Sequence, residues 1–212
     1  MAEDVIAQTL LRECYQPKPL LVVLSGPSGA GKDAILARMR QLGRPYHFVV
    51  TATTRPKRPW EQDGVDYYFL SPEEFERMRA HQGFLEYAQV YGHFYGVPRE
   101  QVRQALAQGK DVLMRVDVQG AKTIRRLVPQ AVFIFVTPPS LAELERRLRQ
   151  RGAESHEALQ RRLQTAQQEM ECLPSFDYLV INEDGRLDEA VSAVEAIICA
   201  EKRRIPHRRV QV

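Results

Sequence analysis

The chain has 212 residues, of which 44% are hydrophobic and 27% charged, which is enough sequence to bury one α/β domain or a core with inserted subdomains. Its 30 basic and 27 acidic side chains leave a formal net charge of only +3. This charge is too small for a protein that coats nucleic acid, so any anion binding must be local.

The composition also carries no signal for secretion or membrane insertion. No run reaches the ~18 apolar residues of a membrane span, and Glu3 and Asp4 stand where a signal peptide has basic residues. Cys14, Cys172 and Cys199 are odd in number, widely spaced and without paired histidines, which argues against a disulfide framework and a zinc site. We therefore expect a cytoplasmic protein with no membrane or nucleic-acid partner.

In chain order, residues 1–19 come first and carry a short amphipathic stretch followed by Pro17 and Pro19. The two prolines prevent a continuous helix into the apolar run at residues 20–24, which we predict as a strand. Residues 1–19 are therefore expected to be an N-terminal extension of the domain.

A phosphate-binding motif follows this strand. Residues 26–33 read Gly-Pro-Ser-Gly-Ala-Gly-Lys-Asp and lead into a helix that begins at Lys32. The spacing G-x-x-x-x-G-K places two glycines where the backbone wraps round a polyphosphate and a lysine whose ammonium reaches the outer phosphates. The motif predicts a nucleoside triphosphate site, and the alternative is a glycine-rich turn. Asp33 departs from the motif, because a Ser or Thr at this position would hold Mg²⁺.

The middle of the chain predicts a mixture of strands and short helices. In order, the expected elements are a helix from Lys32 to Gly43, a strand at residues 48–53, a long basic loop at 54–66, a strand at 67–70, a helix from Ser71 to about Gln82, and a hairpin of residues 84–90 and 93–96. Loops of this length are usually functional. Residues 50–98 are therefore predicted to form a small mixed insert.

The rest of the chain alternates between helices and strands. In order, these are a helix at residues 98–109, a strand at 112–117, a helix at 119–127, a strand at 131–137, a helix at 140–150, a strand at 178–182 and a helix at 187–202. Strands separated by helices predict a parallel sheet that binds ligands at its carboxyl edge, where residues 26–33 and Asp117 would lie. Residues 146–162 form a second basic region.

The ordered motifs resemble those of the guanylate kinases, which transfer the γ-phosphoryl group of ATP to GMP. The resemblance covers about residues 20–200. It rests on Gly26-Pro27-Ser28-Gly29-Ala30-Gly31-Lys32, Thr53-Thr54-Arg55-Pro56-Lys57-Arg58, Asp63-Gly64-Val65-Asp66-Tyr67, Phe84-Leu85-Glu86-Tyr87-Ala88, Tyr95-Gly96, Val116-Asp117-Val118-Gln119-Gly120, Arg147-Leu148 and Arg151-Gly152. The phosphate loop alone would indicate only an NTPase.

The resemblance implies an α/β fold with a P-loop NTPase-type parallel sheet flanked by helices, an inserted mixed α/β monophosphate-binding subdomain and a helical lid. The expected boundaries are a guanylate kinase-like domain at residues 20–202, with its core at 20–49 and 99–202, the GMP-binding insert at about 50–98 and the lid at about 146–162. Residues 203–212 are a basic tail. We predict the basic run from Lys202 to Arg209 as a solvated helix end; an acidic partner is the alternative.

The expected GMP-binding residues are Thr51, Arg55, Arg58, Tyr67, Glu86, Tyr95 and Asp117. Arg55 and Arg58 can give bidentate hydrogen bonds to a phosphate dianion, and the two tyrosines match family positions that donate hydroxyls to it. Guanine presents N1–H and an amino group, so Glu86 and Asp117 fit as acceptors. Taken singly, these residues could instead be a solvated basic loop, core aromatics and an acid that protects an edge strand.

The expected ATP-binding residues are Gly26, Pro27, Ser28, Gly29, Ala30, Gly31, Lys32, Asp33 and Asn182, the last by its resemblance to a residue near the adenine. The expected catalytic residues are Lys32, Arg55, Arg147, Arg151 and Arg162. Phosphoryl transfer needs positioned cations more than a general base, and the last three arginines resemble those of the family's lid. A charged, exposed helix is the alternative for them.

Three positions depart from the family pattern: Asp33, Arg115 in place of an acid, and Val97 in place of a Ser or Thr. A carboxylate is a competent ligand for Mg²⁺, so Asp33 is the candidate metal ligand. We expect Asp33 and Arg115 to form a salt bridge in the nucleotide-free protein, with Asp33 turning to Mg²⁺ when ATP binds. The alternative is that Asp33 only stabilises the helix start and that Arg115 points into solvent.

We therefore predict an ATP-dependent GMP kinase of purine nucleotide metabolism that uses Mg²⁺. One alternative is a guanylate-kinase-like binding module, although such modules have usually lost the loop lysine and glycines that are present here. The other is a related kinase that acts on a phosphorylated sugar. Glu86 and Asp117 argue against it, because a sugar phosphate needs no guanine-reading acceptors.

Overall fold

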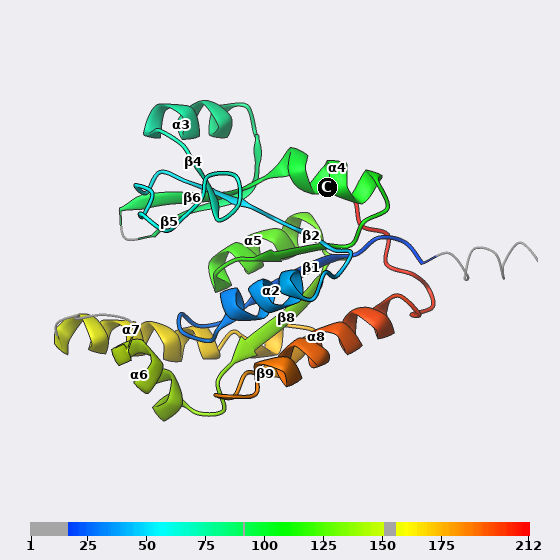
Figure 1. The fold of residues 1–212 in the computed structure, drawn as a ribbon. Helices are drawn as coiled ribbons and strands as arrows, with labels where there is room; N and C mark the ends of the chain where they lie inside the picture. The colour runs from blue at the N-terminus through cyan, green and yellow to red at the C-terminus, as the bar shows by residue number, and fades with distance from the viewer. Residues whose placement is uncertain (1–16, 91, 151–155) are drawn as a thin grey trace, which may run out of the picture.

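The computed structural model describes residues 17–90, 92–150 and 156–212 (Figure 1). The helices are α2 (Lys32–Gln41), α3 (Pro72–Ala80), α4 (Arg99–Ala107), α5 (Val118–Leu127), α6 (Leu141–Gln150), α7 (His156–Met170) and α8 (Leu187–Glu201). The strands are β1 (Leu21–Ser25), β2 (His47–Phe48), β3 (Thr51–Thr53), β4 (Tyr67–Phe69), β5 (Phe84–Val90), β6 (His93–Pro98), β7 (Val112–Arg115), β8 (Val132–Thr137) and β9 (Tyr178–Ile181). No helix among these residues is long and apolar enough to cross a membrane.

The core is a parallel sheet in the order β2-β7-β1-β8-β9 with helices on both faces. The central strand β1 is an apolar run buried along its whole length, as a strand covered on both sides requires. Leu20, Val22 and Leu24 pack with α2 and α8, whereas Leu21 and Val23 pack with α4 and α5. This arrangement confirms the predicted parallel sheet flanked by helices.

The carboxyl ends of the core strands meet at one edge of the sheet, as expected. In the register of β1, Leu24 lies beside Arg115 of β7 and Ser25 beside Phe135 of β8. Residues 26–31 leave β1 at this edge, and α5 begins there after Asp117. In Figure 1 this edge lies between the small sheet with α3 above and the helices α6 and α7 below.

The predicted strand at residues 48–53 is wrong in detail, because the chain changes sheets within it. Strand β2 belongs to the core, whereas β3 belongs to a second sheet in the order β4-β3-β6-β5. The backbone of Val50 lies at the crossing, where no strand partner satisfies it. The Gln101 side chain of α4 does so instead, accepting from Val50 N at 2.7 Å and donating to Val50 O at 3.2 Å.

The second sheet packs against α3 on one face and against the core on the other. On one side Phe84 stacks on Phe75 of α3, with ring centroids 4.3 Å apart. On the other side Leu85 joins the core cluster that contains α4 and α5. Consecutive residues can face opposite sides in this way because they alternate along a strand. Strand β5 therefore links the two layers.

Helix α7 continues eight residues past the predicted helical lid at about 146–162, and its sequence carries the signal for this. Leu159, Leu163 and Ala166 recur at helical spacing and pack against Leu144 and Leu148 of α6. Helices α6 and α7 therefore pair over residues that we predicted as a basic lid. Arg151 lies outside the described residues.

The predicted solvated helix end at the C-terminus is wrong. Helix α8 ends at Glu201, and the chain then folds back over the protein. The Arg208 side chain donates to Glu201 at 2.8 and 2.9 Å and to the carbonyl of Ala131 at 3.0 Å. Val210 and Val212 pack against the core beyond it. A buried carboxylate, whose side chain is 2% exposed, therefore anchors the tail.

Replacing Arg208 by methionine is expected to lower the free energy of unfolding by about 3 kcal/mol, because the buried Glu201 then loses its hydrogen-bonded cation and keeps Arg204 at 3.8 Å. Arg209→Met is the matched control, since Arg209 is exposed. Urea unfolding of both variants measures the difference. Equal stabilities for the two variants would contradict an anchoring role for Arg208.

Candidate active site

Two glycines in the loop after β1 stand where no side chain fits. Gly26 has φ 130°, and a Cβ there would lie 2.1 Å from the carbonyl oxygen of Val136. Gly31 has φ 89°, and a Cβ there would lie 2.1 Å from Nδ2 of Asn182. The loop therefore runs tightly between β8 and the end of β9, and its shape depends on both glycines.

Lys32 begins α2 and curls back over the loop. Its ammonium donates to the carbonyl oxygens of Gly26 at 2.6 Å and Pro27 at 3.0 Å. Desolvation lowers the pKa of Lys32, and the nearby carboxylates of Asp33 and Glu169 oppose this shift. The ammonium is therefore held in the concavity of the loop by acceptors that a phosphate oxygen can replace.

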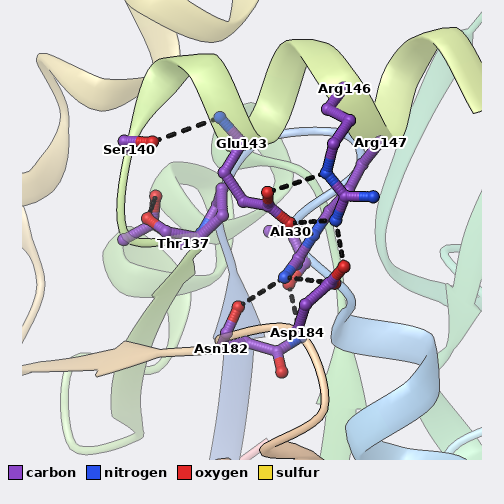
Figure 2. Close-up of polar contacts among 9 residues, drawn as sticks. Ala30, Thr137, Ser140, Glu143, Arg146, Arg147, Asn182 and Asp184 are labelled. Carbon is purple, nitrogen blue, oxygen red and sulfur yellow. Dashed lines mark hydrogen bonds and ion pairs between the residues drawn. The ribbon is translucent and has the colours of Figure 1, made fainter.

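A polar cluster fixes the other side of the loop (Figure 2). Asn182 donates from Nδ2 to the carbonyl oxygen of Ala30 at 2.9 Å. Arg147 of α6 donates to the carbonyl of Asn182 and to Glu143, both at 2.8 Å, and pairs with Asp184 at 3.0 Å. The cluster borders a pocket of about 320 Å³ between α6 and the start of α8. It thus joins the predicted residues Arg147 and Asn182 at one site.

A larger cleft of about 740 Å³ opens between the loop, the second sheet and α7. It brings together most of the predicted residues, namely Gly26, Ser28, Gly29, Gly31, Lys32, Asp33, Thr51, Arg58, Tyr67, Glu86, Tyr95, Asp117 and Arg162. Arg55 does not line it. The Arg55 guanidinium instead pairs with Glu61 at 2.7 Å and lies 5.4 Å from the ring centre of Tyr67.

Two carboxylates lie at the end of the cleft formed by β5 and α5. The Asp117 side chain caps α5 by accepting from Gly120 N at 2.6 Å. Glu86 is 8% exposed, because a bulge between Phe84 and Glu86 turns its side chain inward. Burial, together with the negative charge of Asp117, raises the pKa of Glu86 to about 8.

Gly120 makes room for this pair of acids. A Cβ at Gly120 would lie only 2.9 Å from Oε2 of Glu86. The buried Glu86 carboxylate therefore lies against the start of α5, the helix that Asp117 caps. Such a site suits a ligand group that presents two hydrogen-bond donors.

The predicted salt bridge between Asp33 and Arg115 is confirmed. Arg115 also donates to the hydroxyl of Tyr67 at 2.9 Å. The alternative, in which Arg115 points into solvent, is wrong, because its side chain is only 18% exposed.

Helix α7 contributes more residues to the cleft than the predicted Arg162. Thr165, Gln168 and Glu169 line the cleft from this helix. Burial raises the pKa of Glu169, whose carboxylate lies near Lys32 and bonds to the backbone of Ser28. A helix over these residues would have placed Thr165, Gln168 and Glu169 side by side, because they lie three and four positions apart.

A family model described as guanylate kinase matches residues 18–201. The chain belongs to the guanylate kinase family. It is 46% identical over 197 residues to "Guanylate kinase 2, chloroplastic/mitochondrial" of Oryza sativa subsp. japonica. This alignment covers 92% of this chain and 69% of the relative. The chain is 45% identical over 185 residues to the guanylate kinase of Carboxydothermus hydrogenoformans, covering 87% of this chain and 90% of the relative.

A solved structure agrees with this assignment. The guanylate kinase from Anaplasma phagocytophilum superimposes with a TM-score of 0.70 at 30% identity, covering 89% of this chain and 88% of that one. Both the family and the fold predicted from the ordered motifs are thus confirmed.

Proposed function

We propose that this enzyme transfers the γ-phosphoryl group of ATP to GMP, giving ADP and GDP, in the purine nucleotide metabolism of the cytoplasm. One observation carries the proposal: a single cleft is lined both by the Lys32 loop and by the Glu86–Asp117 pair. The curated relatives named guanylate kinase support it. Neither a binding module nor a sugar-phosphate kinase has comparable support.

On the ATP side, residues 26–32 wrap the β and γ phosphates. The Lys32 ammonium exchanges the carbonyls of Gly26 and Pro27 for phosphate oxygens, and the helix start adds partial positive charge. The adenine occupies the pocket of about 320 Å³ beside Asn182.

On the GMP side, Arg58, Tyr67 and Tyr95 face the monophosphate from the second sheet. Arg55 reaches the same phosphate when Glu61 releases its guanidinium. Guanine lies at the inner end of the cleft, where Glu86 and Asp117 accept from its N1–H and amino group and Thr51 provides a hydroxyl. An adenine base would leave these acceptors unpaired.

In the transfer step an oxygen of the GMP phosphate bonds to the γ-phosphorus, and the bond to the oxygen bridging the β- and γ-phosphorus breaks. ADP keeps that bridging oxygen, and no side chain forms a covalent bond. The residues act by position and charge. Arg162 already donates to Ser28 of the loop at 3.1 Å, and Arg147 lies beside the adenine pocket. The role of Arg151 stays a prediction.

A magnesium site fits the chain if ATP supplies most of the ligands. The described residues contain no cluster of three or more His, Cys, Asp or Glu side chains able to hold a metal ion. Mg²⁺ in kinases takes one or two carboxylates together with phosphate oxygens and water. Asp33 provides such a carboxylate beside Lys32, with its side chain 59% exposed. Bound Mg²⁺ would neutralise part of the phosphate charge.

The raised pKa of Glu86 predicts that the affinity for guanosine depends on pH. A charged carboxylate accepts from both guanine donors, whereas the protonated carboxyl retains fewer acceptor sites. Since the pKa is about 8, the dissociation constant should fall roughly tenfold from about pH 6.5 to about pH 8 and then level off. Calorimetric titration with guanosine tests this without a titrating phosphate. Glu86→Gln should remove the slope, and a flat wild-type profile would contradict the prediction.

A steady-state assay with ATP and a panel of acceptors tests the proposed function. GMP should be phosphorylated with the highest kcat/KM, and AMP, UMP and ribose phosphates should be poor acceptors. Efficient use of a ribose phosphate would favour the sugar kinase, and loss of all turnover with intact nucleotide binding would favour the binding module.

A further inference from the structure

Arg115 lies at the junction of the two substrate sites. It ends β7 beside Leu24 of β1, the strand that leads into the phosphate loop. Its guanidinium pairs with Asp33 on the ATP side and donates to the Tyr67 hydroxyl on the GMP side at 2.9 Å. Arg115 therefore contacts one residue from each site and lines the cleft between them.

The hydrogen bond from Arg115 to Tyr67 leaves the tyrosine hydroxyl free to donate its own proton to another group. The phenolic oxygen accepts from Arg115, so its own O–H remains available as a donor. The Arg115 guanidinium also lies 5.3 Å from the Tyr67 ring centre. The Arg55 guanidinium lies 5.4 Å from the same ring centre. Tyr67 is therefore held by two guanidinium groups, and each of these is paired with a carboxylate.

The two members of the Arg115 pair differ in how easily they separate. The Asp33 side chain is 59% exposed, so water can replace its partner at little cost. The Arg115 side chain is 18% exposed and needs an anion close by. A phosphate dianion offers more charge and more acceptor oxygens than one carboxylate. An incoming phosphate can thus displace Asp33 from Arg115.

We propose that Arg115 is an additional phosphate-binding residue of the GMP site and that GMP binding frees Asp33 from it. The guanidinium exchanges the Asp33 carboxylate for an oxygen of the GMP phosphate while Tyr67 donates to the same group. The released Asp33 would then be available to hold Mg²⁺ beside the triphosphate. Both substrates favour the state in which Asp33 and Arg115 are separated. ATP and GMP therefore bind with positive, reciprocal coupling. This inference rests on the proposed function.

The first test separates phosphate binding from base binding within each protein. Dissociation constants of GMP and of guanosine are measured by calorimetry without ATP or Mg²⁺. Arg115→Met should weaken GMP binding by about 10- to 100-fold, as expected for a charge-assisted hydrogen bond, and leave guanosine binding unchanged. Arg38→Met is the matched control, because it removes the Arg38–Asp188 ion pair from α2 outside the cleft. An unchanged ratio of the two constants in Arg115→Met would overturn the proposal.

The second test uses a variant that should improve binding. Asp33→Asn removes the competitor of the phosphate and should strengthen GMP binding about threefold or more, because an exposed ion pair contributes little. In the Arg115→Met background the same substitution should have no effect. If Asp33→Asn weakens GMP binding, or acts equally in both backgrounds, the exchange does not occur. Wild-type turnover of GMP is measured separately, so failure here leaves the proposed function standing.

Discussion

Replacing Lys32 by methionine is expected to lower kcat by about 10³-fold or more, the effect that a single positioned cation has on phosphoryl transfer. The ammonium is the cation most tightly held in the loop, at 2.6 Å from the carbonyl oxygen of Gly26. Methionine keeps the length of the side chain but cannot neutralise the charge that develops on the phosphates. The folded protein should tolerate it, because the carbonyls that Lys32 bonds can bind water.

Single-turnover kinetics at saturating ATP and GMP measure this effect on the chemical step. Lys122→Met on α5 is the control, since Lys122 is exposed and outside the cleft. GMP binding should change little in Lys32→Met, because Lys32 serves the donor nucleotide. A rate within about tenfold of the wild type would remove Lys32 from the transfer step.

At a pH above about 8, where the Glu86 carboxyl is charged, replacing Glu86 by glutamine is expected to lower kcat/KM for GMP by about 30- to 1,000-fold, equivalent to about 2 to 4 kcal/mol. Glutamine turns one acceptor into a donor that faces the donors of guanine. Binding of ATP should be unaffected, because Glu86 lies on β5 of the second sheet, whereas Lys32 belongs to the loop that follows the core strand β1. Glu76→Gln on α3 is the matched control, since its side chain is 55% exposed.

The same variant should lose a pH dependence of stability. The Glu86 carboxyl ionises near 4.5 when unfolded but near 8 in the folded protein. Between these values the unfolded state binds fewer protons, so the free energy of unfolding falls as pH rises from about 4.5 to about 8. Glu86→Gln removes this fall, so relative to the wild type it gains stability as pH rises. If it instead loses both kcat/KM and stability at about pH 8, Glu86 is structural and not a guanine ligand.

The sequence by itself determined the phosphate loop, the family and the parallel sheet flanked by helices. These depend on local patterns: the glycine and lysine spacing of residues 26–32, and buried strands that alternate with helices. Even the Asp33–Arg115 salt bridge was predicted, because parallel strands end at one edge and the two charges follow neighbouring strands. The roles of individual site residues stay predictions, although the cleft brings most of them together.

Only the tertiary structure decided features that depend on contacts between distant segments. The crossing at Val50 needs Gln101 of α4, and the tail is held because Arg208 meets Glu201 and Ala131. The inward turn of Glu86 depends on a bulge whose partner strand lies across the hairpin. The contact between Arg115 and Tyr67 joins two sheets through residues 48 positions apart. No local period encodes such contacts, because they form when separate elements pack and satisfy each other's polar groups.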